Sequence, residues 1–595
     1  MTSETKTCQN CKNQFTVEPE DFDFYKKISV PPPTWCPECR LERRLLWRNE
    51  RTLYKRKCDL CGKDMLSIYS DDKDQVVYCP PCWWSDKWDS LAYGRDYDFS
   101  RSFFEQFREL HRRVPLPALN TLHLTLTNSE YVNQAGHLKN CYLIFNSDYN
   151  EGCCYGTEVE GSKDCFDNLM IDQCELAYGC VNCRKCSRVF FSVDCESCQN
   201  VYFSRDLIGC DNCFGCVGLR NKKYHIFNQP FSKEDYEAEL VKFDIGSFKN
   251  IGDISGRAEA LVMEIPKKYI HGRQNTNVSG DYINHCRDVF HSYVAIESQN
   301  CKHCLWLIAK PVKDCWDYTE YGDAAERVYE TLLAGKEVGD IKMSVLSFNA
   351  TYNTEYSNLS YASNNLFSCA SLRNKQFCIL NKQYSEAEYK NLREKIIEQM
   401  NELPYKDKQG REYRYGEFFP PELSPFAYNE TTAVEIFPLT KERTLAKGYK
   451  WQESKERDYK VSLTHSNLPN HIKDVDESIL KETIGCAHEG KCNEQCTKAF
   501  KIIEPELQFY RKMNLPLPRL CPNCRHYERL KQRNPLKLWH RQCTCAGQKS
   551  ENSVYQNTAQ HFHGDNHCPN EFETSYAPER PEIVYCEQCY QAEVV

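Results

Sequence analysis

Between about residues 120 and 400, the chain repeats a short pattern of one cysteine, a few apolar or aromatic positions, and polar turn-forming residues. A short period with small apolar residues at a fixed phase is typical of a β-solenoid. We expect coils of about 24 residues, two units per turn, with the cysteines stacked in ladders inside the core as small hydrophobic residues. The cysteines that follow the twelve-residue spacing are Cys141, Cys153 and Cys165, then Cys174, Cys186, Cys198 and Cys210, and Cys183 with Cys195.

Cysteines three residues apart in this segment leave a second hypothesis open, a cluster of several metal ions. Because residues three apart on a regular strand face opposite sides of a sheet, these cysteines could bind metal only from turns. They are Cys183 and Cys186, Cys195 and Cys198, and Cys210, Cys213 and Cys216.

The repetitive segment is itself duplicated. The sequence Leu-Arg-Asn-Lys at residues 219–222 recurs at residues 372–375, and the residues that follow match at the same offset of 153. Ser232 and Ser385 each precede an acidic residue by three positions, the spacing of a helix N-cap and its N3 partner. We therefore expect each half to end in a last strand and a helix, because the final coil of a solenoid needs a cap.

The second half is poorer in cysteine, and its units are marked by Cys286, Cys301, Cys304 and Cys315. Residues 321–340 are predicted to form a helical insertion. Residues 401–480 are rich in proline, tyrosine and charge, which favours an extended or linker-like segment that either packs along the solenoid or connects it loosely.

Cysteines at the two ends of the chain follow a different rule. The first 82 residues contain four Cys-x-x-Cys pairs in a row. Each pair forms a tight knuckle, and two facing knuckles complete a tetrahedral zinc site, so the sequence predicts two Cys₄ sites here. Redox-active pairs are the alternative, but that chemistry uses a single pair at the start of a helix. The predicted ligands are Cys8, Cys11, Cys36 and Cys39 for the first site, and Cys58, Cys61, Cys79 and Cys82 for the second.

The C-terminal region repeats this design at a constant offset of 485 residues. Phe24-Tyr25 matches Phe509-Tyr510, and the Cys-Pro-x-Cys-Arg sequence that begins at Cys36 recurs at Cys521. An internal duplication of this kind predicts two more zinc sites, and about four Zn²⁺ per chain. The predicted ligands are Cys492, Cys496, Cys521 and Cys524 for the third site, and Cys543, Cys545, Cys586 and Cys589 for the fourth.

Other donors compete for these two sites. Cys486 and His488 lie close to the third set in sequence, and a long insertion carries Cys568, His561, His563 and His567 into the fourth. The choice among them stays open on sequence grounds.

The motif Cys8-x-x-Cys11, the acidic step at Glu18 and Glu20, and Cys36-Pro37-x-Cys39-Arg40 resemble the family of bacterial proteins known as probable zinc ribbons. This resemblance covers about forty residues at each end of the chain. It implies a small zinc-bound β-ribbon and no defined activity. The whole layout also resembles uncharacterised cysteine-rich bacterial proteins in which ribbons flank a repetitive middle.

The predicted fold is mainly β: a duplicated right-handed β-solenoid flanked by small Cys₄ zinc ribbons, with a few capping and linker helices. The expected organisation is zinc ribbons at 1–57 and 58–119, a cysteine-rich solenoid half at 120–236, a helical linker at 237–272, a second solenoid half at 273–400, a linker at 401–480, and zinc ribbons at 481–542 and 543–595.

Composition narrows the class of protein. The chain has 595 residues, of which 41% are hydrophobic, and 37 are cysteine, an odd number that excludes complete internal disulfide pairing. There is no long apolar run and no hydrophobic core of a signal peptide near Met1, so we expect a cytoplasmic protein with reduced thiols and no membrane partner. The net charge of −8 means that any nucleic-acid binding must come from local patches.

Two such patches follow the Cys-Pro-x-Cys-Arg knuckles. Residues 40–57 contain eight Lys or Arg against two Glu, and residues 525–541 contain six against one, with Trp and Tyr interleaved. Positive charge beside planar rings suits phosphate contact and base stacking, so RNA or DNA is a predicted partner. An acidic protein or nucleoprotein, or a merely solvated helix face, is the alternative. The predicted contact residues are Arg40, Arg43, Arg44, Arg48, Lys55, Arg56, Arg525, Arg529, Lys531, Arg533 and Arg541.

Sequence motifs of an enzyme are missing: there is no glycine-rich phosphate loop, HExxH or GxSxG. A solenoid can host a carbohydrate-active site, so we keep that as a further alternative, to be tested by whether carboxylates converge in one groove. The candidates are Asp148, Asp164, Asp167, Asp172, Asp194 and Asp206. The sequence favours a non-enzymatic, zinc-stabilised scaffold or binding protein.

Overall fold

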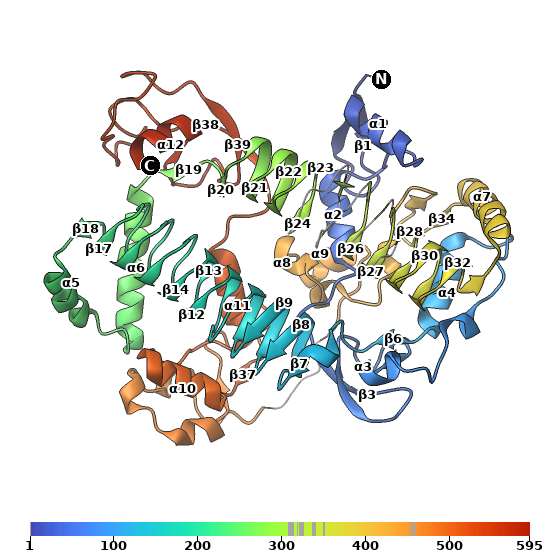
Figure 1. Ribbon diagram of the computed structural model, residues 1–595, viewed down its shortest axis with the longest axis horizontal. Helices are drawn as coiled ribbons and strands as arrows, with labels where there is room; N and C mark the ends of the chain where they lie inside the picture. Colours follow the sequence, from blue (N-terminus) through green and yellow to red (C-terminus); the bar gives the residue numbers. More distant parts are fainter. Residues whose placement is uncertain are drawn as a thin grey trace. The chain divides into compact units, whose positions relative to one another are not determined.

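The computed structural model describes residues 2–307, 315–317, 319, 327–335, 339, 341–348, 352–453 and 459–594. Within them the chain is mainly β, with many parallel strand pairs and twelve α-helices (Figure 1). Two compact units form. Unit 1 consists of Met1–Leu119, Ile270–Glu453 and Leu536–Leu538; unit 2 consists of Asn120–Tyr269, Ser454–Pro535 and Trp539–Val595.

Unit 2 is built around parallel strands that pair with the next strand twelve residues further along. Leu169 pairs with Val181, and Val189 pairs with Val201. One turn therefore takes twelve residues and one sequence unit, and the expected coil of about 24 residues is wrong. One sheet contains β7 (Leu126–Thr127), β8 (Val132–Lys139), β9 (Tyr142–Glu151), β10 (Cys154–Glu160), β11 (Leu169–Asp172) and β13 (Val181–Arg184). The other contains β12 (Glu175–Tyr178), β14 (Ser187–Phe190), β15 (Gln199–Tyr202), β16 (Asp211–Phe214), β17 (Lys223–Ile226) and β18 (Gln229–Pro230).

The turn is this short because the backbone changes direction at every third residue. Asn182, Lys185 and Arg188 all have φ near +50°, and this left-handed conformation recurs at the same phase through unit 2. Residues three apart therefore lie on the same side of the chain, contrary to the expectation from a regular strand. The inward positions of two successive turns are Cys180, Cys183, Cys186, Val189, Ser192, Cys195, Cys198 and Val201, and all are buried.

The cysteines of this segment form the predicted ladders inside one hydrophobic core. The Cys183 thiol donates weakly to the carbonyl oxygens of Val181 (3.6 Å) and Ser192 (3.5 Å). The Ser192 hydroxyl, at an equivalent position, donates to the Phe190 carbonyl at 2.9 Å. Burial raises the pKa of the Cys153 thiol well above its usual range. The cysteines of these ladders are small, buried core residues, which favours the structural hypothesis over a metal cluster.

Unit 1 repeats the same pairing. Val289 pairs with Cys301, and Leu366 with Cys378, again twelve residues apart. Its strands are β20 (Gly272–Arg273), β21 (Thr276–Asn284), β22 (Arg287–Ile296), β23 (Gln299–Lys302), β24 (Leu305–Leu307) and β25 (Cys315–Trp316), followed by β26 (Leu332–Gly335), β27 (Val345–Phe348), β28 (Tyr352–Glu355), β29 (Asn358–Tyr361), β30 (Asn364–Phe367), β31 (Ala370–Arg373), β32 (Gln376–Ile379) and β33 (Lys382–Gln383).

Both predicted capping helices are present. Ser232 caps α5 (Lys233–Leu240), and Ser385 caps α7 (Glu386–Glu402), each by accepting the N3 backbone N–H with its hydroxyl. In unit 2 a longer helix, α6 (Phe248–Glu264), follows α5 (Figure 1). These helices cover strand edges that would otherwise be exposed at the ends of the sheets, which is the physical reason for the caps.

One sequence prediction needs correction. The helical insertion predicted at 321–340 is wrong where the structure describes it, because Leu332–Gly335 forms β26; residues 321–326, 336–338 and 340 lie outside the described residues. Of the two arrangements expected for residues 401–480, residues 405–453 adopt the packed one, since the side chains of Phe418, Phe419 and Tyr428 are fully buried in unit 1. Short elements in this segment are β34 (Tyr405–Lys406), β35 (Glu412–Tyr413), α8 (Ala433–Ile436) and α9 (Lys441–Ala446).

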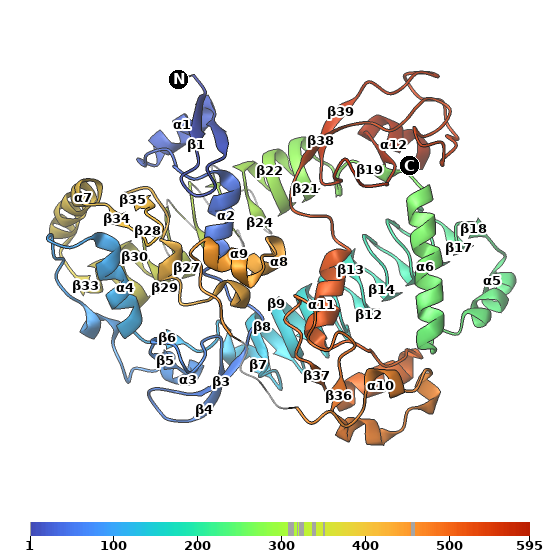
Figure 2. The ribbon, with the colours of Figure 1, turned by 180° about the vertical axis from the view of Figure 1, so that it is seen from behind.

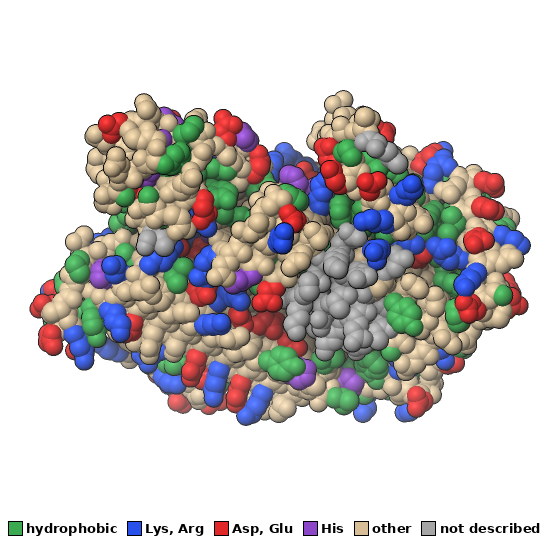
Figure 3. Space-filling view, turned by 45° about the horizontal axis from the view of Figure 1, so that its top comes forward, with side chains coloured by type: hydrophobic (Ala, Val, Ile, Leu, Met, Phe, Trp, Pro, Cys, Tyr) green, Lys and Arg blue, Asp and Glu red, His purple; other side chains and the backbone are tan. Residues whose placement is uncertain are grey.

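The outer surface carries charges of both signs. In unit 2 the Lys139 ammonium lies 2.8 Å from Glu151, one turn away, and Lys163 lies 4.0 Å from Glu151 on its other side. On the face drawn in Figure 3, Lys and Arg side chains are interspersed with Asp and Glu. In the described part of the chain, no helix combines the length and apolar character needed to cross a bilayer.

Candidate metal centres

Four copies of one small module hold the terminal cysteines. Each begins with a two-stranded antiparallel hairpin, and its second cysteine pair lies at the N-terminus of a helix. The hairpins are β1/β2 (Glu4–Thr7, Gln14–Val17), β3/β4 (Tyr54–Lys57, Asp64–Ser67), β36/β37 (Ile484–Gly485, Ala499–Phe500) and β38/β39 (Trp539–Gln542, Glu571–Thr574). The helices are α2 (Pro37–Leu45), α3 (Pro80–Trp83), α11 (Pro522–Lys531) and α12 (Glu587–Val594). We call them modules 1 to 4 in chain order.

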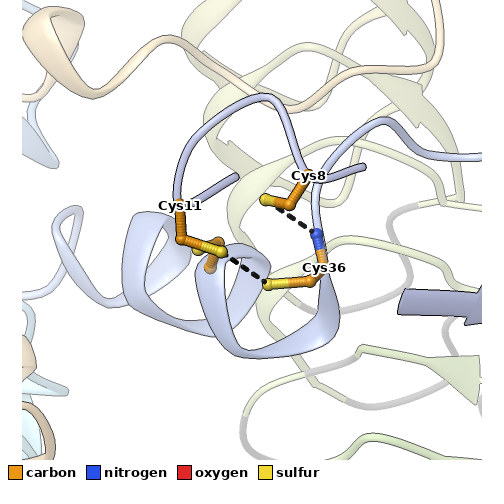
Figure 4. A group of neighbouring side chains, drawn as sticks. Cys8, Cys11 and Cys36 are labelled. Carbon is orange, nitrogen blue, oxygen red and sulfur yellow. Dashed lines mark hydrogen bonds between the residues drawn. The ribbon is translucent and has the colours of Figure 1, made fainter. Parts of the chain in front are cut away.

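Module 1 shows the geometry most simply (Figure 4). Cys8 and Cys11 come from the hairpin end, and Cys36 precedes α2. The Cys11 and Cys36 sulfur atoms are 3.7 Å apart, and the Cys36 backbone N–H donates to the Cys8 sulfur at 3.3 Å. The sulfur atoms of these three residues and Cys39 all lie within 4.8 Å of one another. Four thiolates at this separation could hold one metal ion with tetrahedral coordination.

The same N–H···S contact recurs in the other modules. Cys79 donates to Cys58 at 3.2 Å, Cys521 to Cys486 at 3.3 Å, and Cys586 to Cys543 at 3.2 Å. A backbone donor aimed at sulfur stabilises the thiolate form that a metal requires. The contact also identifies Cys8, Cys58, Cys486 and Cys543 as equivalent first ligands, and each module has four sulfur atoms that could hold a metal ion.

The first two predicted ligand sets are brought together as expected, but the last two need one replacement each. The third group is Cys486, Cys496, Cys521 and Cys524, so Cys486 replaces Cys492, whose sulfur lies 3.7 Å from that of Cys524. The fourth group is Cys543, Cys568, Cys586 and Cys589, so Cys568 replaces Cys545.

An insertion inside the first knuckle explains both replacements. In module 1 the Cys8 N–H donates to the Asn13 carbonyl; in modules 3 and 4 the equivalent bonds run from Cys486 to Lys498 and from Cys543 to Asn570. The two knuckle cysteines are therefore adjacent in space but far apart in sequence, and the Cys-x-x-Cys rule misses them. A usable signal was present, because Cys11 and Cys496 obey the offset of 485.

The helices that carry the second knuckles are fixed to the parallel strands by buried ion pairs. In unit 1 the Arg40 guanidinium lies 2.6 Å from the carboxylate of Asp317, and Arg44 lies 3.5 Å from its other oxygen. In unit 2 Arg525 and Arg529 lie 2.5 Å and 2.8 Å from the two oxygens of Asp167. We call each carboxylate with its two arginines an arginine clamp. The arginines sit four residues apart, on one face of α2 or α11.

Aromatic contacts accompany each arginine clamp. Phe24 of α1 (Pro19–Lys27) stacks on Trp316 with ring centroids 4.1 Å apart, and Phe509 of α10 (Glu504–Met513) stacks on Phe166 at 4.3 Å. Helix α11 packs against β10 and β11 of the unit 2 sheet (Figure 2). The duplicated sequence motif is therefore a docking surface as well as a candidate metal site.

These contacts correct the predicted nucleic-acid role of six arginines. Arg40, Arg43, Arg44 and Arg48 are at most 2% exposed, and Arg525 and Arg529 are 7% and 4% exposed. Arg43 pairs with Glu330 and Glu417, and Arg48 pairs with Glu50. Buried, ion-paired guanidinium groups are not available to phosphates. Sequence could not distinguish five of these arginines from exposed ones, because carboxylates that pair with them lie hundreds of residues away; Arg48 pairs locally, with Glu50.

The other five predicted contact residues are at least partly exposed. Lys531 pairs with Glu494 and Glu528, Arg56 pairs with Asp59, and Arg541 donates to the Ala577 carbonyl. Arg533 contacts the Met170 sulfur, and Lys55 is exposed on β3.

The carboxylates proposed for a carbohydrate-active site do not share one position of the twelve-residue turn. Asp148 and Asp172 flank Glu160 in one row, Asp194 and Asp206 occupy a second row, and Asp164 a third. Burial raises the pKa of Glu160 to about 9, helped by Asp148 and Asp172. Asp167 is paired with Arg525 and Arg529 in the arginine clamp. This distribution gives no support to the glycosidase alternative.

Comparison with known proteins gives no family. No family model matches the chain, and no curated protein matches it. One solved structure found in the comparison, named "putative acetyltransferase from Desulfovibrio desulfuricans G20", shares 9% identity over 48% of this chain and 84% of its own, with a TM-score of 0.10. A similarity of that size carries no argument about fold or function.

Replacing Cys486 tests the corrected third metal group. We expect Cys486→Ser to lower the bound metal by one ion per chain, because it removes a sulfur that belongs to the group. Cys492→Ser is the matched control and is expected to leave the metal content unchanged. Elemental analysis against protein concentration measures both; the reverse pattern would restore the set predicted from sequence spacing.

Neutralising the carboxylate of an arginine clamp tests its structural role. Asp167→Asn removes the carboxylate that the buried Arg525 and Arg529 guanidinium groups share and leaves Arg525 with Glu506, so we expect the free energy of unfolding to fall by about 3–5 kcal/mol. Asp172→Asn, which breaks the more exposed pair with Arg184, is expected to cost less than about 1 kcal/mol. Chemical denaturation measures both variants, and equal effects would contradict the assigned role.

Proposed function

We propose that the protein is a non-enzymatic scaffold in which zinc ribbons are docked on β-solenoids. The twelve-residue parallel register and the inward ladders support the solenoid. A hairpin and a helix N-terminus that present four cysteines support the zinc ribbon, since all-thiolate tetrahedral groups suit Zn²⁺. From these features together we infer a rigid platform with about four structural zinc ions.

The arginine clamps are the observation that carries this proposal. They join the helix of a metal module to a bend next to the parallel strands of the solenoid through buried charges. A structural zinc there would order the knuckle and, through the helix, hold both arginines against the carboxylate. Four cysteine ligands leave no open coordination position for water or substrate, so the metal would act on stability rather than on chemistry.

Cobalt substitution tests whether these metals are structural. We expect Co²⁺-loaded protein to show a tetrahedral thiolate absorption spectrum that does not change when azide or cyanide is added, because each ion already has four protein ligands. An anion-dependent change in the spectrum would reveal an open position and would overturn the non-enzymatic proposal. Apo protein prepared by chelation serves as the control for metal-free absorption.

A nucleic acid is the second candidate, now as a partner of module 2. Its hairpin exposes Lys55 and Lys57 on β3, and Lys63 in the turn. The matching strand β38 is neutralised, because His540 lies 3.0 Å from both Glu571 and Glu573. Module 2 therefore offers a lysine-bearing hairpin for phosphate contact that module 4 lacks, whereas the mixed charges on the face in Figure 3 favour a protein partner.

Charge reversal on β3 distinguishes the two partner classes. If RNA or DNA binds here, the double variant Lys55→Glu with Lys57→Glu should weaken binding at least tenfold at low salt and flatten the salt dependence. The control reverses two exposed lysines of unit 2, Lys233 and Lys249, with the same change in net charge. Binding to mixed single- and double-stranded RNA and DNA is measured by salt titration, and no binding at low salt would leave a protein partner.

A further inference from the structure

Module 4 contains a second group of metal ligands that the sequence did not place. Its first knuckle is interrupted by residues 544–567, and this insertion returns three donor side chains to the metal centre. The atoms of Cys545, His561, His563 and Cys589 that could bind a metal lie within 4.8 Å of one another. The Cys545 sulfur is 3.5 Å from His561 Nδ1, and His563 Nε2 is 3.3 Å from the Cys589 sulfur.

Cys589 belongs to both groups of module 4. Its sulfur is 3.7 Å from that of Cys568, which belongs to the Cys₄ group, and it also faces His563 of the second group. We propose that module 4 holds two divalent, borderline-soft metal ions such as Zn²⁺, bridged by the Cys589 thiolate. Cys543, Cys568 and Cys586 complete the first coordination sphere, and Cys545, His561 and His563 complete the second.

The residues around the second group orient its ligands. His561 uses Nε2 to contact the Glu593 carboxylate at 2.8 Å, and both side chains are fully buried. Glu593 in turn accepts the backbone N–H groups of Thr558 and Ala559. A carboxylate behind a histidine fixes the ring and leaves Nδ1 for a metal, the arrangement typical of histidine ligands.

The remaining ligands are oriented in the same way. His563 directs Nδ1 to the Asn566 carbonyl at 2.7 Å, which leaves Nε2 toward Cys589. The Asn557 amide donates to the Cys545 sulfur at 3.2 Å, and Tyr585 holds that amide by donating to its oxygen at 2.7 Å. Donors aimed at a sulfur atom stabilise its thiolate form. The insertion is thus built as a coordination sphere around a second ion.

Module 3 also has an insertion in its first knuckle, but the donors of this insertion are arranged differently. Its insertion contributes Cys492 beside Cys524, but the ring of His488 pairs with Glu494, with Nδ1 at 3.0 Å from the carboxylate. We assign one metal to modules 1, 2 and 3 and two to module 4, or five ions per chain. This count goes beyond the zinc-ribbon scaffold proposed above and does not depend on its partner.

Metal counting on the full-length, zinc-loaded chain tests the binuclear centre. We expect five ions per chain by elemental analysis, and four in Cys545→Ser and in His563→Ala. His567→Ala is the matched control with five ions, because His567 lies in the same insertion and points Nδ1 at the Cys568 carbonyl instead. Four ions in the unaltered protein, with no loss in Cys545→Ser, would overturn the proposal and leave the scaffold proposal intact.

Cadmium substitution gives a second test that needs no variant. Nuclear magnetic resonance of the ¹¹³Cd-loaded chain should show five signals, two of them split by coupling between cadmium nuclei through the shared Cys589 sulfur. One of this pair should have the shift of a four-sulfur site and the other that of a site with two sulfurs and two nitrogens. Signals without any coupled pair would exclude the bridge.

Discussion

Two buried carboxylates, Asp317 and Asp167, each held between two arginines of one helix, determine how the metal modules attach to the parallel strands. The desolvation of three charges is costly, and it is offset only when the geometry neutralises them closely. The helix supplies that geometry because its first residues follow a knuckle cysteine, Cys36 or Cys521. The knuckle cysteines, the orientation of the helix and the ion pairs are therefore linked parts of one arrangement.

The chain order shows that this arrangement does not depend on connectivity. In unit 1 the helix precedes its carboxylate by 277 residues, whereas in unit 2 it follows its carboxylate by 358 residues. The stacked rings show the same reversal: Phe24 precedes its partner Trp316 in the chain, whereas Phe509 follows its partner Phe166. A contact that survives reversal of the chain order is specified by complementary surfaces and not by a short linker. This explains why the Phe-Tyr and Cys-Pro-x-Cys-Arg motifs recur together.

The sequence predicted what is local and periodic. Twelve-residue spacing, buried cysteine ladders, the Ser232 and Ser385 caps and two complete Cys₄ groups all follow from residues close together in the chain. The turn length was wrong because a left-handed backbone at every third position makes residues three apart face one side. Many of these positions are Asn or Asp, which tolerate this conformation, but the twelve-residue cysteine spacing does not reveal it. Arg40, Arg43, Arg44, Arg525 and Arg529 were missed because charge counts do not reveal a partner hundreds of residues away.

The cysteine groups of modules 3 and 4 show why spacing rules fail in a different way. A knuckle requires two sulfurs close in space, and the hairpin provides this at its two strands regardless of how many residues lie between them. In modules 1 and 2 only two residues separate the two cysteines of the first knuckle. In module 4 a loop separates them, and this loop folds back over the cysteine group. Because the loop starts and ends at ligands, Cys543 and Cys568, its own donors are forced close to the first metal. A shared ligand such as Cys589 is then the simplest way to satisfy both groups, since two separate tetrahedral spheres would need eight donors where the module offers seven.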